Sequence, residues 1–101
     1  MPVLIVRYDV AEEGLAEVAT AVEAAFAAVR ESAPDGIRYS YLRRAGSTEF
    51  VALLQLADGV ENPLPGIEAT RLLQATVAKW VIGDPPAPEA FEVLGDYRML
   101  T

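Results

Sequence analysis

Cysteine and histidine are both absent from this chain of 101 residues. Without cysteine there can be no disulfide, no thiolate nucleophile and no iron–sulfur cluster, and the common zinc sites are excluded. Without histidine the chain lacks the usual general base at neutral pH and the imidazole ligand of most haem and transition-metal sites. Any chemistry must therefore proceed without thiol or imidazole, and we expect neither a metal nor a bound cofactor.

Positive charge and long hydrophobic runs are also scarce. Eight Lys and Arg residues face 15 Asp and Glu residues, for a net charge of −7. This charge opposes binding to nucleic acid. The longest apolar stretch, residues 15–29, is interrupted by Glu17 and Glu23, so we expect no membrane partner. The start of the sequence shows no secretion signal, so we expect a cytoplasmic protein.

Hydrophobic residues make up 52% of the sequence, and they follow two patterns, one typical of strands and one typical of helices. Segments 3–8, 37–44, 49–56 and 91–100 are rich in β-branched, aliphatic and aromatic residues and predict strands. Apolar residues recur at steps of three and four over residues 12–31 and 67–81, which predicts two amphipathic helices. The length allows one core, so residues 1–101 are expected to form a single domain.

The order strand, helix, strand, strand, helix, strand predicts a ferredoxin-like βαββαβ fold of the α+β class. Its four-stranded antiparallel sheet should carry both helices on one face, with the first and third strands in the middle. Both of these middle strands are apolar on their two faces. In the first, Val3 and Ile5 lie opposite Leu4 and Val6, and in the third, the residues Phe50, Ala52 and Leu54 lie opposite Val51 and Leu53. One apolar face is left uncovered, so we expect a homodimer packed through its sheet faces.

The chain resembles the dimeric α+β barrel proteins and, within them, the antibiotic-biosynthesis-monooxygenase group. The resemblance lies in the order of the helices and strands and in the general strand and helix character of segments such as MPVLIVRYDV, FVALLQLADGVENPLPG and LGDYRML. It implies a small apolar ligand between sheet and helices. Members oxidise phenolic polyketides without a cofactor, degrade haem, or isomerise and break down small metabolites. The haem-degrading branch needs a histidine ligand, which this chain lacks.

The cofactor-free oxygenases of this group are associated with Asn, Trp, Arg and Tyr residues around the substrate, and this chain can be compared with them by residue type. Trp80 could form an aromatic wall for a planar substrate, although a helix tryptophan on an apolar stripe is more often core. Arg7 lies in a central strand and must reach solvent or find a partner. It could line a ligand cavity or pair across the dimer with a carboxylate such as Asp9.

Tyr39 and Tyr41 share one face of the second strand and could present hydroxyl groups to a phenolate or carboxylate. On an edge strand the same tyrosines could equally be ordinary amphipathic surface. Asn62 precedes Pro63 and most simply starts a turn, with a substrate contact as the alternative. The candidate substrate-binding residues are thus Arg7, Tyr39, Tyr41, Asn62 and Trp80, and no catalytic residue is assigned.

Two functions of different class fit this sequence. The first is a cofactor-free monooxygenase or isomerase for a small phenolic or enolisable metabolite, in which Arg7 with Tyr39 or Tyr41 stabilises the developing anion. The second is a non-catalytic homodimer that binds a small apolar ligand or serves as a scaffold.

Overall fold

The structure of the protein, a computed structural model, describes residues 2–99. The long strands are β1 (Val3–Val10), β2 (Ile37–Arg43) and β3 (Glu49–Leu56), and the helices are α1 (Leu15–Ser32) and α2 (Glu68–Trp80). Two short strands follow α2, β4 (Val81–Ile82) and β5 (Glu89–Phe91), and two 3-10 turns, η1 (Glu12–Gly14) and η2 (Leu64–Gly66), precede the helices. The expected α+β class is confirmed.

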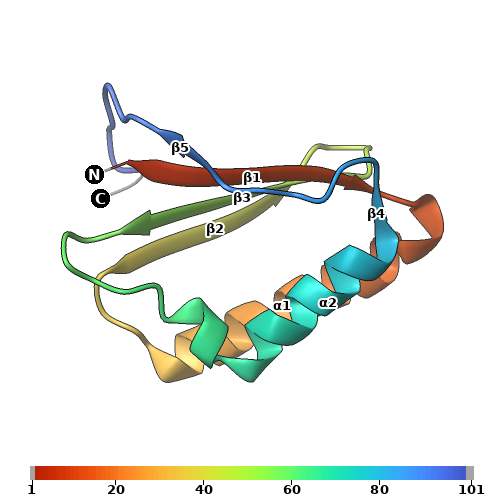
Figure 1. Cartoon of the computed structure of the whole chain (residues 1–101), viewed down its shortest axis with the longest axis horizontal. Helices are drawn as coiled ribbons and strands as arrows, with labels where there is room; N and C mark the ends of the chain where they lie inside the picture. Colours follow the sequence, from red (N-terminus) through yellow and green to blue (C-terminus); the bar gives the residue numbers. More distant parts are fainter. Residues whose placement is uncertain (1, 100–101) are drawn as a thin grey trace.

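The strands form one antiparallel sheet in the order β2-β3-β1-β4, and β5 also pairs with β1. The first and third strands therefore lie in the middle, as the sequence predicts. The register places Tyr8 opposite Phe50 and Val6 opposite Ala52. Figure 1 shows both helices on the same side of this sheet.

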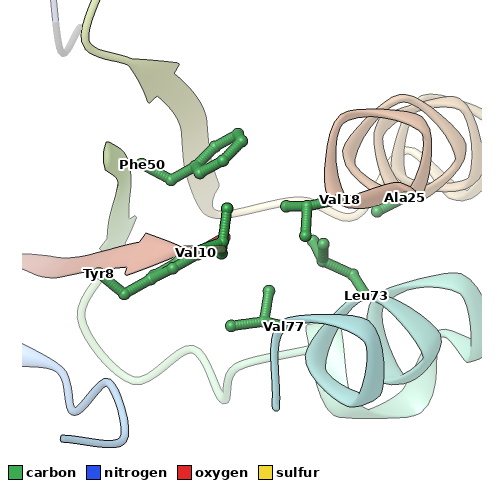
Figure 2. Close-up of a cluster of buried hydrophobic side chains, with 7 residues drawn as sticks. All are labelled: Tyr8, Val10, Val18, Ala25, Phe50, Leu73 and Val77. Atoms are coloured by element: carbon green, nitrogen blue, oxygen red, sulfur yellow. The ribbon is translucent and has the colours of Figure 1, made fainter. Parts of the chain in front are cut away.

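The hydrophobic core lies between the sheet and the two helices. Side chains from alternate positions of β1 and β3 point toward the helices because successive side chains of a strand lie on opposite faces. Figure 2 shows the buried cluster that results. It comprises Tyr8, Val10 and Phe50 from the sheet side, Val18 and Ala25 from α1, and Leu73 and Val77 from α2.

The helices begin and end where the sequence supplies a physical reason. Glu12 and Glu13 lie in η1 at the start of the first helical segment, where negative charge is favourable. Ala33 adopts a left-handed φ of 45° and donates its N–H to the Val29 carbonyl, so α1 stops just before Pro34. No helix within residues 2–99 is both long and apolar enough to span a membrane.

The prediction of a fourth strand over residues 91–100 holds at Phe91 and is wrong for residues 92–99. The strand pairing with β1 instead comes from β4 and β5, and residues 92–99 belong to no strand. The register between β5 and β1 explains the difference. Phe91 pairs with Val3, which is the first residue of β1, so the residues after Phe91 extend beyond the end of β1 and have no strand to pair with there. Leu100 lies outside the described residues.

A proline-rich segment separates β4 from β5 along the edge of β1. Residues 83–88 read GDPPAP, and their three prolines have no backbone N–H to donate to a ladder. Asp9 and Val10 therefore pair with β4, Val3 to Ile5 pair with β5, and the stretch between them is left without a strand partner on that side. This segment becomes part of the wall of the candidate site.

Trp80 fastens the end of α2 to the start of α1. Its indole Nε1–H donates to Oε2 of Glu17 over 2.9 Å, and the Ala11 N–H donates to the Trp80 carbonyl over 2.9 Å. Gly14 lies against the ring so closely that a Cβ at that position would sit 2.2 Å from Cγ and Cδ2 of Trp80. Because the φ of Gly14 is −93°, the requirement for glycine here is one of space, not of backbone conformation.

We therefore expect Gly14→Ala to destabilise the fold by about 1–3 kcal/mol, the usual cost of overpacking. Chemical denaturation followed by circular dichroism measures this difference. Gly95→Ala is the matched control, because nothing lies within 4 Å of a Cβ there and its φ is not positive. Equal stability of the two variants would contradict the packing role of Gly14.

Candidate functional site

A cavity of about 570 Å³ lies between the sheet and α2, and we call it the inner cavity. Volumes of this size accommodate drug-sized molecules. Its floor consists of the helix-facing side chains of β1, β2 and β3, and its walls come from the loop before α2, from α2 and from the proline segment. The lining residues are Leu4, Val6, Tyr8, Tyr39, Tyr41, Ala52, Leu54, Asn62, Leu64, Thr70, Leu73, Gln74, Val77, Ala78, Val81, Pro85, Pro86 and Pro88.

Three tyrosines from two strands meet at the floor of the inner cavity. The hydroxyls of Tyr8 and Tyr41 are hydrogen-bonded to each other, and the rings of Tyr39 and Tyr41 meet edge to face with centroids 6.3 Å apart. Phe26 of α1 stacks on Tyr39 at 4.7 Å, and Phe50 stacks on Tyr8 at 5.6 Å. The aromatic contacts fix the phenol rings, so their hydroxyls are held in defined positions.

These phenols hold their protons more tightly than free tyrosine does. Burial raises the pKa of Tyr39 to about 12, and burial raises that of Tyr8 to about 12 against a smaller opposite effect of its hydrogen bond to Tyr41. Burial and the hydrogen bond to Tyr8 also raise the pKa of Tyr41. At neutral pH all three are hydroxyl donors and acceptors, not tyrosinate bases.

Asn62 and Thr70 supply polar groups at the opposite wall. The Asn62 side-chain oxygen accepts the N–H of Leu64 over 3.0 Å, which is the turn geometry expected from the sequence, and the residue also lines the cavity. Thr70 is buried, and its hydroxyl donates to the carbonyls of Leu64 and Ile67. These hydrogen bonds hold η2 against the first turn of α2 and shape this wall.

A second, more open hollow of about 670 Å³ lies at the free edge of β2, and we call it the edge groove. It shares Tyr39 and Tyr41 with the inner cavity but is bordered only by α1, β2 and the turn that joins them. Arg30 lies 5.9 Å from the centroid of the Phe26 ring at this groove. The inner cavity has walls from more elements and contains the buried polar groups, so we regard it as the candidate site.

The structure brings together Tyr39, Tyr41 and Asn62 of the residues singled out from the sequence, and it separates Arg7 and Trp80 from them. Arg7 pairs with Val51 on the face of the sheet away from the helices, where its side chain is exposed. Trp80 packs partly against the core and bonds to Glu17, and it is not among the residues lining the inner cavity. Their assignment to a ligand site gains no support from this geometry.

Neither Tyr8 nor Thr70 is among the candidate site residues named from the sequence. The alternation of β1 carries the missing signal for Tyr8, because this residue shares a face with Leu4 and Val6 and that face meets the helices. No comparable signal exists for Thr70. Its burial depends on how the loop before α2 folds, which periodicity does not describe.

By sequence, the chain matches no protein-family profile and no curated protein. By structure, it is similar to a protein from Nitrosomonas europaea described provisionally as an antibiotic biosynthesis monooxygenase. The TM-score is 0.70 at 20% identity, over 94% of this chain and 100% of the other. The protein Rv0793 of Mycobacterium tuberculosis gives a TM-score of 0.69 at 20% identity, over 95% and 98%. The chain thus has the ferredoxin-like fold of the antibiotic-biosynthesis-monooxygenase-like proteins, as the sequence resemblance implied.

The raised pKa values predict an alkaline transition. Unfolded tyrosine ionises near pH 10, whereas Tyr8 and Tyr39 in the folded chain ionise near pH 12. The folded state therefore binds more protons between these values, and its stability should fall as the pH rises from about 10 to 12. Near-ultraviolet absorbance titration of native and urea-unfolded protein measures the ionisation. Native absorbance that follows the unfolded curve would show that the phenols are not buried.

Proposed function

We propose that the protein is a cofactor-independent monooxygenase or isomerase, and that it acts on a small phenolic or enolisable molecule bound in the inner cavity. The observation that carries this proposal is the cluster of tyrosine hydroxyls at the floor of a largely apolar cavity. The description of the Nitrosomonas europaea protein as an antibiotic biosynthesis monooxygenase supports the same class of activity.

The chemistry of such a substrate requires little from the protein. A reactive CH₂ group next to a phenolic ring reacts with O₂ to give a carbonyl and water, so that the substrate supplies both electrons and hydrogens. The substrate first loses a proton, and negative charge develops on its oxygen. The Tyr8 and Tyr41 hydroxyls are fixed donors that can stabilise this charge in a cavity of low polarity. Since the tyrosines remain protonated, the proton passes to solvent.

Replacement of one tyrosine hydroxyl tests this role. We expect Tyr41→Phe to lower the rate of oxygen uptake by about 10²-fold, the usual effect of removing one donor to a developing oxyanion. The measurement is an oxygen-electrode screen against hydroxyanthrones and quinols. Tyr97→Phe is the matched control, because Tyr97 is 80% exposed and does not line the cavity. Arg7→Ala should leave the rate unchanged, and absence of turnover across the panel would contradict the enzymatic proposal.

A non-catalytic ligand-binding protein is the second candidate, and a specific observation favours it. Among the described residues that line the inner cavity none is an Asp, Glu, Lys or Arg, and the tyrosines do not ionise near neutral pH. The cavity therefore contains no general base of suitable pKa. Recovery of a bound quinol unchanged under oxygen would support this function over the enzymatic one.

We also propose that two copies associate through the sheet face that the helices leave uncovered. On this face the central strands place Ile5 beside Leu53, and the edges add Leu42 and Phe91. Leu42 is 52% exposed and Phe91 is 41% exposed in the single chain. Large apolar side chains that are exposed on one sheet face favour association, because a second copy would remove them from water.

Light scattering at micromolar concentration should therefore give the mass of a dimer. We expect Leu42→Asp to weaken the dimer at least tenfold, because it places charge in the contact. Leu72→Asp is the matched control: Leu72 is 59% exposed but lies on α2, away from the sheet face. A monomeric wild-type protein, or equal weakening by both variants, would contradict this interface.

A further inference from the structure

The inner cavity lacks a counter-charge for an ionised ligand. The titratable side chains that face it are Tyr8 from β1 and Tyr39 and Tyr41 from β2, while β3, α2, the loop before α2 and the proline segment contribute only uncharged groups to its described lining. Charged residues do occur on these elements, but they lie outside the lining. They are Arg7 and Asp9 on β1, Arg38 and Arg43 on β2, Glu49 on β3, Asp58, Glu61 and Asp84 in the flanking loops, and Glu68, Arg71 and Lys79 on α2.

Several of these charges are also engaged elsewhere. Arg71 donates to the Pro65 carbonyl over 2.7 Å, and the Lys79 ammonium lies 3.4 Å from the Glu17 carboxylate. Neither cation is therefore directed at the cavity. The net charge of −7 adds a general field that disfavours the approach of an anion.

From this arrangement we propose that the inner cavity selects uncharged ligands, so that a phenol enters it in its protonated form. The inference rests on the proposed function, because it assumes that this cavity is the ligand site. Transfer of an anion from water into an apolar cavity is costly unless a charge compensates it, and here none does. The same surroundings act on the protein's own phenols, which is why Tyr8 and Tyr39 hold their protons to about pH 12.

The tyrosine pair can recognise a neutral phenol or carbonyl. One hydroxyl of the Tyr8–Tyr41 pair donates to the other, so the pair retains one hydrogen and further lone pairs for a ligand oxygen. A ligand hydroxyl can donate to the pair or accept from it, whereas a carbonyl can only accept. In the enzymatic case the substrate then enters uncharged and ionises only when bound, so its ionisation is the step that these hydroxyls assist.

Equilibrium dialysis with 4-nitrophenol and 4-nitroanisole tests the selection. The two probes have nearly the same shape, but only 4-nitrophenol ionises, and its phenolate absorbs visible light. Retention of 4-nitrophenol should fall about tenfold for each pH unit above its own pKa, while retention of 4-nitroanisole should stay constant. Addition of protein at that pKa should also bleach the phenolate band.

The outcomes separate this inference from the function on which it rests. Retention of 4-nitroanisole together with equal or stronger retention of the nitrophenolate would overturn the selection for uncharged ligands. Retention of neither probe at any pH would overturn the cavity as a ligand site, and with it the proposed function. Bleaching of the phenolate band together with pH-independent binding of 4-nitroanisole would support both.

A pair of variants on α2 provides the matched control. Ala78 lines the cavity and is exposed, whereas Ala75 is exposed on the same helix but does not line it. Ala78→Lys should improve retention of the nitrophenolate about fivefold, the size of an exposed ion pair, and Ala75→Lys should not. An unchanged preference for the neutral probe in Ala78→Lys would show that something other than the missing counter-charge excludes the anion.

Discussion

The pairing of β1 with β3 is the constraint on which the rest of the structure depends. Its register places Tyr8 beside Phe50 and Val6 beside Ala52 on the face that meets the helices. The same register places Ile5 beside Leu53 on the opposite face. A slip of one residue in either strand would exchange the two faces, so the core, the floor of the cavity and the proposed contact between copies are all fixed together.

The inner cavity combines largely apolar walls with a few hydroxyl groups. Those of Tyr8 and Tyr41 are hydrogen-bonded to each other, and that of Thr70 is hydrogen-bonded to backbone. This combination could orient a ligand by hydrogen bonding, but the described lining provides no group that could take a proton near neutral pH. The oxidation proposed here is compatible with such a site, because it draws its electrons from the substrate. The ligand would then supply most of the reactivity. The protein would hold the ligand in position, exclude water from it and provide hydrogen-bond donors.

Helices and strands with a strong hydrophobic periodicity are predicted well from the sequence. Strands whose extent depends on their register against a distant strand are predicted less well. The range 49–56 is that of β3, and the helices at 12–31 and 67–81 agree with η1–α1 and α2 to within a residue or two. The strand expected at 91–100 failed because composition alone cannot show that β1 has no residues left to pair beyond Val3. Among the candidate site residues, strand alternation was sufficient to group Tyr39 with Tyr41. It could not show that the proline segment would complete the wall beside them.

The position of Trp80 has a practical consequence for the study of this protein. It is the single tryptophan of the chain, and its indole bridges the start of α1 and the end of α2 through Glu17 without lining the inner cavity. Its fluorescence therefore reports whether the two helices are docked against each other. Because the indole does not line the inner cavity, a ligand bound there would have no direct contact with it, and helix separation could still be followed optically in its presence.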